Sequence, residues 1–347
     1  MTKSVLIGKH VIGQDNQIYL IAEVGTTCLG DINQAFALIE AGADSGMDAI
    51  KFQLIDPDQE SDKSATYMVR TPAYTKNINR SEMFRKLQFS REEWKSIIDK
   101  CHSHNVDFFV TVDYVKGVDM LEEYAVPAHK IGAWDTTYKP LIQRIGQTGK
   151  PMFIDLGPTT EEELHTLVRW YIDAGGSAII FLHDFHTNND MEMNMDAIRY
   201  LQDISEWPVG YTSPARDHDL DFLALGMGAK ALEKRLIMDR NVDAFHAHES
   251  LEPDELKAWV KRIRHAEHAI GRRGILPSTT DRTGRDKYYR SICTLRAIKK
   301  GDVFTPDNLH GKRPGTGLPT DYLDKVWGKR AARDLAADIL INEADIQ

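Results

Sequence analysis

Short apolar segments alternate with segments of helical periodicity through most of the 347-residue sequence. The apolar segments predict strands at residues 18–23, 49–53, 107–112, 128–131, 152–156, 177–183, 209–211 and 231–235. Helical patterns follow these strands, and the last of them covers residues 253–270. Eight strand-helix units over about 250 residues match the size of a (β/α)8 barrel. The sequence therefore predicts an α/β fold of the TIM-barrel class. A doubly wound sheet is disfavoured because no glycine-rich turn follows the first strand.

Residues 54–89 interrupt this alternation because they show no strong period of either kind. Loops of this length in a compact domain are usually functional, so we expect a lid or a substrate loop here. Regular structure resumes at Ser90, where Ser90 and Glu93 form a capping-box pattern at the start of a helix.

The composition changes after the last long helix. Residues 272–288 are rich in Arg, Gly, Ser, Thr and Asp and are interpreted as a linker. We therefore expect a catalytic barrel domain over residues 1–271 and a second domain over residues 289–347. Roughly sixty residues build only a thin core, so the second domain is expected to pack on something else.

Charge and cysteine usage restrict the partners and the compartment. A net charge of −9 argues against nonspecific binding of nucleic acid. No apolar run reaches the roughly 18 residues of a membrane span, and residues 1–10 lack the apolar region of a secretory signal. Cys28, Cys101 and Cys293 lie far apart, which suggests neither a disulfide framework nor a cysteine zinc site. We expect a cytoplasmic protein with a small-molecule substrate and without nucleic-acid or membrane partners.

Polar side chains mark the ends of the predicted strands, which is where barrel enzymes carry their active sites. They are Glu23, Lys51, Gln53, Thr111, Asp113, Lys130, Asp155, His183, Tyr211, Thr212, Glu233 and Arg235. Because an unpaired buried ammonium is costly, Lys51 must face a polar cavity or an anion. Lys51, Lys130 and Arg235 together predict a site for a carboxylate or phosphate, held by charge-assisted hydrogen bonds. The alternative is that each cation forms a structural pair with a carboxylate of the same ring.

Histidines cluster at two places just past predicted strands, where imidazole and carboxylate groups could bind a metal together. They are His183, His186, His246 and His248. Histidines on loops are usually solvated, so this cluster is kept only as an alternative metal site.

Motifs that extend over nearly the whole chain occur together in one known protein family. They include Ile21-Ala22-Glu23-Val24-Gly25, Lys51-Phe52-Gln53, Val126-Pro127-Ala128-His129-Lys130-Ile131, Met238-Asp239-Arg240 and Lys312-Arg313-Pro314-Gly315-Thr316-Gly317. On these motifs the chain resembles the sialic acid synthase family, which joins a TIM barrel to a C-terminal antifreeze-like SAF domain of the β-clip type. The resemblance implies the same two-domain organisation here.

Members of this family condense phosphoenolpyruvate with an N-acetylated amino sugar, and a divalent metal such as Mn or Mg holds the sugar aldehyde. The resemblance implies a domain-swapped homodimer in which Arg313 of one subunit reaches the sugar site of the other. The family's catalytic and phosphoenolpyruvate positions are matched by Glu23, Lys51, Gln53, Thr111 and Lys130.

The metal ligands of the family are not preserved in this chain. One ligand position holds Pro214, which has no ligand atom, and the other holds Arg235, whose guanidinium has no free lone pair. We therefore expect no metal cofactor at this position. Arg235 would instead place its guanidinium near the lost ion and polarise the acceptor aldehyde.

Other departures concern the two substrates. Asp155 and Ala133 stand where the family has phosphate-binding serines, and the Asp155 carboxylate would repel a phosphate. His246 aligns with the sugar-binding aspartate. Substrate-binding roles are therefore expected for Thr111, Asp135, Asp155, His183, Tyr211, Thr212, Glu233, His246 and Arg313.

Three functions remain open at this point. The first is condensation of phosphoenolpyruvate with an aldehyde sugar to a 2-keto-3-deoxy sugar acid, without the metal. The second is a lyase or aldolase in which Lys51 or Lys130 forms a Schiff base with a non-phosphorylated keto acid or sugar. The third is a non-catalytic homologue that binds a sugar or a partner protein.

Overall fold

The computed structural model describes residues 3–13, 16–70, 75–187, 189–213, 215–272 and 274–347. The chain forms two compact units, Met1–Gly271 and Arg272–Gln347, and each is considered by itself.

Eight parallel strands of the first unit close into a barrel, in the spatial order β3, β4, β7, β8, β9, β10, β11, β12 and back to β3. This confirms the TIM-barrel fold expected from the alternating pattern. The strands are β3 Tyr19–Glu23, β4 Ala49–Leu54, β7 Asp107–Val112, β8 His129–Ile131, β9 Met152–Asp155, β10 Ile179–His183, β11 Val209–Thr212 and β12 Ala231–Arg235.

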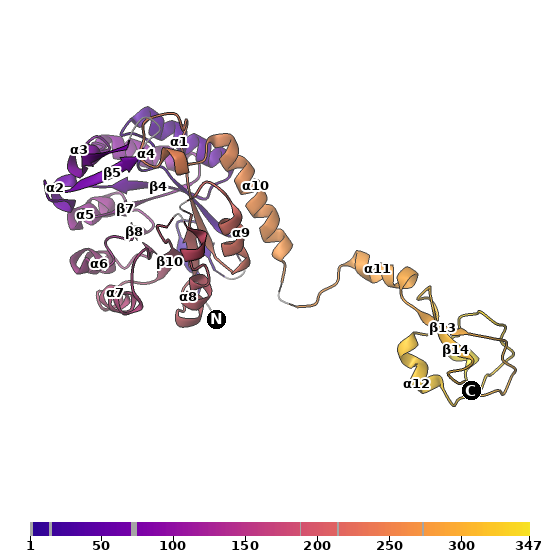
Figure 1. Ribbon diagram of the computed structural model, residues 1–347. Helices are drawn as coiled ribbons and strands as arrows, with labels where there is room; N and C mark the ends of the chain where they lie inside the picture. The colour runs from indigo at the N-terminus through magenta and orange to yellow at the C-terminus, as the bar shows by residue number, and fades with distance from the viewer. Residues whose placement is uncertain (1–2, 14–15, 71–74, 188, 214, 273) are drawn as a thin grey trace. The chain divides into compact units, whose positions relative to one another are not determined.

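The main helices of this unit lie around the outside of the barrel (Figure 1). The Ser90 capping box is formed, with the Ser90 hydroxyl accepting from Glu93 N and the Glu93 carboxylate accepting from Ser90 N. The first helix ends at Gly46, whose φ of 88° favours glycine. The helices are α1 Ile32–Ser45, α4 Arg91–Ser103, α5 Val115–Glu123, α6 Lys139–Gly146, α7 Glu161–Asp173, α8 Ala197–Ile204, α9 Asp219–Gly226 and α10 Pro253–Ile270.

Side chains alternate between the inside of the barrel and the layer beneath the helices. In β10, Ile180 and Leu182 belong to the interior cluster, whereas Ile179 and Phe181 belong to the larger core that includes helix residues. Deep inside the barrel the rings of Phe109 and Phe153 stack 4.9 Å apart. This alternation decides which residue at each strand end can reach a central cavity.

Residues 54–89 are more regular than we expected. They contain helix α2 Pro57–Glu60, an antiparallel hairpin of β5 Thr66–Arg70 and β6 Thr75–Asn79, and helix α3 Arg80–Arg85. These elements are too short to show a strong period in the sequence.

A second hairpin, β1 Val5–Ile7 with β2 His10–Ile12, packs against the N-terminal part of the barrel interior. Val5, Ile7 and Ile12 are buried in the same cluster as Tyr19 and Ile21 of β3. The Tyr19 hydroxyl donates to Asp107, at the start of β7, over 2.9 Å. The hairpin therefore closes the barrel interior at the end opposite the strand termini discussed below.

The second unit contains helix α11 Thr279–Tyr288, strands β13 Ser291–Thr294 and β14 Leu309–Lys312, and the short helix α12 Leu323–Val326. Its small core gathers around Ile292, Phe304 and Ile341. The segment interpreted as a linker contains α11, which buries none of its residues. Within the part of the chain that the structure describes, no helix is long and apolar enough to cross a membrane.

Candidate active site

A cavity of about 370 Å³ lies at the carboxyl ends of the barrel strands. Most of the residues selected from the sequence line it. They are Glu23, Lys51, Gln53, Thr111, Asp135, Asp155, Thr212, Glu233, Arg235 and His246. The cavity also takes in Arg80 and Phe84 of α3, so the insertion after β4 forms part of its wall.

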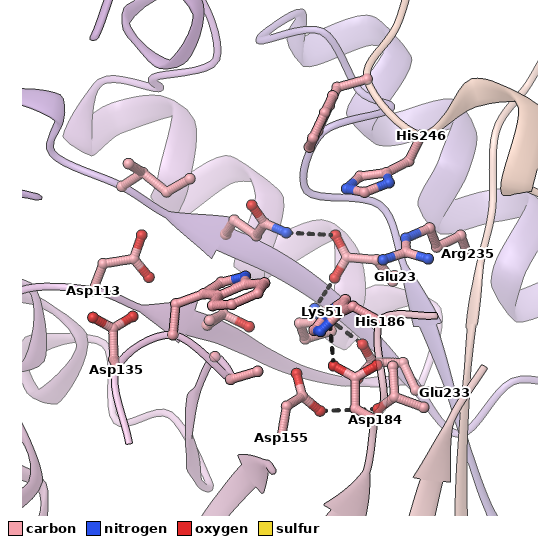
Figure 2. A pocket seen from close by; sticks show the side chains of 18 of the residues that line it. Glu23, Lys51, Asp113, Asp135, Asp155, Asp184, His186, Glu233, Arg235 and His246 are labelled. Carbon is pink, nitrogen blue, oxygen red and sulfur yellow. Dashed lines mark hydrogen bonds and ion pairs between the residues drawn. The ribbon is translucent and has the colours of Figure 1, made fainter. Parts of the chain in front are cut away.

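A network of buried charges forms the floor of this cavity (Figure 2). Lys51 Nζ pairs with the carboxylate of Glu23 and lies 3.1 Å from Glu233 Oε1. Glu233 Oε2 accepts from Lys130 Nζ over 2.7 Å. Glu23 Oε1 is held by the backbone N–H of Gly25 at 2.8 Å. Strands β3, β4, β8 and β12 thus bring two ammonium groups and two carboxylates into one connected chain.

Asp155 extends the network on the β9 side. Its Oδ2 lies 2.8 Å from Lys130 Nζ, and its Oδ1 accepts from the Thr212 hydroxyl over 2.9 Å. Lys130 is completely buried, and its ammonium lies between two carboxylates, those of Asp155 and Glu233. The sequence left open whether the cations at the strand ends form ion pairs with carboxylates of the same ring or face a cavity. In the structure Lys51 does both, because it pairs with Glu23 and also lines the cavity.

The two lysines of the network differ in proton affinity. Burial and the nearby charge of Lys130 lower the pKa of Lys51 to about 8, although Glu233 opposes the shift. Burial alone would lower the pKa of Lys130 as well, but the carboxylates of Asp155 and Glu233 raise it. Burial would raise the pKa of Glu233, but the two ammonium groups lower it to about 2. Lys51 is therefore the amine that loses its proton more readily.

Arg235 ends strand β12 and faces the cavity beside His246 (Figure 2). Glu249 holds both groups, with its Oε2 3.0 Å from Arg235 Nη1 and 2.8 Å from His246 Nδ1. Burial and the Arg235 charge lower the pKa of His246 to about 4, so its imidazole is neutral near pH 7. The cavity thus has a positive group, fixed by an ion pair, on its β12 side.

On β12, Lys234 lies between Glu233 and Arg235, which face the cavity, and its side chain points to the other face of the strand. Its buried Nζ donates to Asp221 Oδ2 at 2.8 Å, to Ser213 Oγ at 2.9 Å, and to the carbonyls of Ala215 at 2.7 Å and Asp217 at 2.8 Å. Lys234 therefore ties the segment after β11 to β12 and helix α9.

Asp184 and His186 follow strand β10 and were not selected as an acid-base pair from the sequence. Asp184 is 3% exposed, and its Oδ2 lies 3.3 Å from His186 Nε2. Burial and the Asp155 charge raise the pKa of Asp184, while burial lowers the pKa of His186. The His186 ring stacks on Trp134 at 5.1 Å. These shifts favour the uncharged forms of the Asp184 carboxyl and the His186 imidazole at the cavity wall.

Asp113 and Asp135 occupy the wall on the β7 and β8 side, away from Lys51 (Figure 2). Burial and mutual repulsion raise the pKa of Asp113, and burial with the nearby Glu60 charge raises the pKa of Asp135 to about 6. Arg80 lies near both carboxylates, and its Nε donates to Glu60 over 2.7 Å. This end of the cavity is acidic.

Two residues expected to bind substrate face away from the cavity. His183 Nε2 bonds to the carbonyl of Met193 over 2.8 Å, and Tyr211 is buried in the outer core. Inward and outward positions alternate, so the neighbouring Asp184 and Thr212 reach the cavity instead. His183 and Tyr211, which were expected to bind substrate, therefore do not line this cavity. Arg313 lies in the second unit, and its Nε donates to the Tyr288 carbonyl at 2.7 Å.

The donor set does not fit a divalent metal at the family position. Arg235 offers no lone pair, and Pro214 lies outside the described residues. The alternative histidine cluster is not assembled either, because His183 faces outward and His248 lines a different cavity. Among the residues that the structure describes, no group of three or more His, Cys, Asp or Glu side chains could hold a metal ion.

Comparison with known proteins identifies the family. A sequence model of the NeuB family matches residues 38–274, more than half of the chain, and a model of the SAF domain matches residues 289–347. The chain belongs to the NeuB family. This confirms the resemblance that the motifs suggested.

Relatives in the NeuB family match along almost the entire chain. An uncharacterized protein of Methanocaldococcus jannaschii is 30% identical, over 99% of both chains. The N,N'-diacetyllegionaminic acid synthase of Campylobacter jejuni is 28% identical, over 93% of this chain and 98% of its own. The crystal structure of a spore coat polysaccharide biosynthesis protein of Bacillus subtilis has a TM-score of 0.65 at 26% identity, over 99% of both chains. These relatives support a NeuB-like sugar acid synthase.

Proposed function

We propose that this protein joins phosphoenolpyruvate to the aldehyde of an amino-sugar-class acceptor and releases a 2-keto-3-deoxy sugar acid and phosphate. The observation that carries the proposal is the buried network of Glu23, Lys51, Glu233 and Lys130 at the floor of a cavity of about 370 Å³. Charged groups are costly to bury, so a network of this kind is better explained by a substrate site than by packing.

In the proposed reaction the methylene carbon of the donor forms a bond to the aldehyde carbon of the acceptor. The aldehyde oxygen gains negative charge, and the Arg235 guanidinium, fixed by Glu249, stabilises that charge. A proton completes the new hydroxyl, and Asp184 with His186 is positioned to supply it. Water adds to C2 of the donor, and phosphate leaves as the keto group forms.

The proposal extends to the assembly that the family resemblance implies. The second unit presents Arg313 on an exposed segment, and α11 buries none of its own surface. In a domain-swapped homodimer Arg313 would complete the acceptor site of the partner subunit. The oligomeric state of the protein in solution tests the proposed dimer separately from the proposed reaction.

The reaction is tested with chelator-treated full-length protein, phosphoenolpyruvate and a panel of aldoses and amino sugars. We expect phosphate release that depends on the acceptor, with a product whose mass equals the sum of both reactants and water minus phosphoric acid. Lys51→Met and Arg235→Met should each lose nearly all activity. Lys9→Met, a surface change on the N-terminal hairpin, should leave it unaltered. Phosphate release that no acceptor stimulates would count against the proposal.

One observation favours a second candidate, an aldolase that uses Lys51 as a Schiff-base amine. With a pKa of about 8, Lys51 reaches its nucleophilic form at a lower pH than an ordinary lysine does. Pyruvate would form a Schiff base with Lys51 and release water, and borohydride should then reduce that C=N bond to a stable N-carboxyethyl amine on Lys51. An unmodified protein after this treatment would reject the aldolase and leave the synthase.

A further inference from the structure

The carboxyl groups of Asp113 and Asp135 lie near each other at the acidic end of the cavity (Figure 2). Within the part of the chain that the structure describes, neither side chain has a hydrogen bond or an ion pair. Asp113 directly follows β7, and Asp135 lies in the loop between β8 and α6. Two carboxylates in one pocket repel each other, and a bound cation would stabilise the charged form of both.

A second unpartnered group faces the same end of the cavity. Thr111 lies two residues before Asp113 on β7 and lines the cavity with it. Thr111 is 7% exposed, and its hydroxyl has no hydrogen-bond partner among the described residues. A buried hydroxyl normally has a partner, so this one points to a missing polar ligand rather than to packing.

The cations nearest this pair, Arg80 and Lys51, each have carboxylate partners elsewhere. Arg80 pairs with Glu60 through both its Nε and its terminal nitrogen. Lys51 is engaged by Glu23 and Glu233 on the other side of the cavity. The acidic end therefore offers two carboxylates and a hydroxyl to a ligand that carries hydrogen-bond donors and positive charge.

We propose that Asp113 and Asp135 bind an ammonium group of the substrate, so that the acceptor is a sugar with a free amine instead of an N-acylated one. The inference rests on the proposed function and names its acceptor class. An ammonium has three donors and one positive charge, which suits two carboxylates and the Thr111 hydroxyl. An N-acetyl group has a single N–H and no charge, and it would leave the carboxylates unbalanced.

Trp134 adds an independent reason for an amino sugar. Its side chain is 66% exposed beside Asp135, lines the cavity and is stacked on His186. An indole face attracts cations. A sugar ring lying on this face would direct an amine toward Asp135.

A divalent metal bridging the two carboxylates is the principal competitor. Two carboxylates and one hydroxyl are fewer protein ligands than such an ion usually takes. The described residues also contain no third carboxylate or histidine placed to complete a metal site here. An ammonium needs no such completion.

The test is calorimetric titration of the full-length, chelator-treated protein at pH 7 without a donor. The probes are glucosamine, mannosamine and galactosamine, their N-acetyl derivatives and the parent hexoses. At least one free amine should bind about tenfold more tightly than its N-acetyl and parent counterparts. Asp113→Asn should remove that preference, whereas Asp173→Asn, an exposed change on α7, should retain it.

Folding of the variant is checked first by its melting temperature. Asn has the size of Asp, and the change relieves repulsion, so Asp113→Asn should melt at the same or a higher temperature. Equal affinity for amine and N-acetyl forms, or an unchanged preference in Asp113→Asn, would overturn the inference. So would Mn²⁺ binding that Asp113→Asn abolishes, or no binding by any of the sugars.

This titration contains no phosphoenolpyruvate and requires no turnover. A protein that binds the amine and makes no product would contradict the synthase proposal alone. A synthase that prefers N-acetylated acceptors would contradict the ammonium site alone.

Discussion

Lys130 Nζ lies 2.8 Å from Asp155 Oδ2 inside the barrel, where Lys130 is fully buried. The same ammonium bonds to Glu233 at 2.7 Å, so two of its three donors are already used. A phosphate that approaches Lys130 must therefore compete with carboxylates that belong to the protein. In the proposed reaction this pairing would oppose binding of the donor's phosphate.

Replacing Asp155 should make anion binding stronger. In Asp155→Asn the Thr212 hydroxyl keeps an acceptor, while Lys130 loses one competing charge. We expect inorganic phosphate to bind about tenfold more tightly, as for one added hydrogen bond to a charged group. Titration calorimetry measures this, with Asp119→Asn, a surface change on α5, as the control. An unchanged phosphate affinity would show that Asp155 does not limit the donor site.

Removing Lys130 should destabilise the barrel strongly. Lys130→Met leaves Asp155 and Glu233 buried without their shared cation, which typically costs about 3 to 5 kcal/mol in the free energy of unfolding. The comparison is Arg144→Met, which breaks a more exposed pair with Asp119 and should cost no more than about 1 kcal/mol. Urea unfolding of both variants decides the point. Equal losses in the two variants would contradict the buried-pair account.

His246 should contribute to loss of stability in acid. Its pKa is about 4 in the folded protein against 6.5 for a free side chain, so the unfolded chain binds the proton more readily. Unfolding is therefore increasingly favoured as the pH falls from about 6.5 to about 4. Because the side chain remains 24% exposed, the effect is at most about 3 kcal/mol.

His246→Asn should flatten this part of the stability curve, measured by urea unfolding at pH 7, 5.5 and 4. Asn is the suitable replacement because residue 246 has a φ of 67°, which Asn tolerates well. The exposed His165→Asn serves as control. If both variants follow the parent curve, His246 is not a source of the acid sensitivity.

A chain that ends at Gly271 should fold, because the first unit has its own continuous core. It should also be monomeric and inactive if Arg313 acts across a dimer. Light scattering after size-exclusion chromatography and the phosphate-release assay measure the two properties. An active, dimeric barrel would refute the role of the second unit.

The barrel could be predicted from the sequence because buried parallel strands are short, apolar and regularly spaced. Lys51 and Glu233 could be selected because charged residues at the ends of such strands need a polar cavity. The sequence could not predict that His183 and Tyr211 lie outside the cavity. Strands β10 and β11 are largely apolar on both faces, so no alternation shows which of their residues point inward. The sequence did not predict that Trp134 lines the cavity or that Asp184 pairs with His186. Loop geometry brings these side chains to the cavity, and strand periodicity does not reveal it.

Strand β12 carries three consecutive charges, and each is bound by different elements: Glu233 by the interior lysines, Lys234 by α9 and the segment after β11, and Arg235 by Glu249. Adding or deleting one residue in this strand would turn all three side chains to the opposite face at once. Chimeras made between family members should therefore tolerate exchanged loops on either side of β12, provided that their junctions preserve its length.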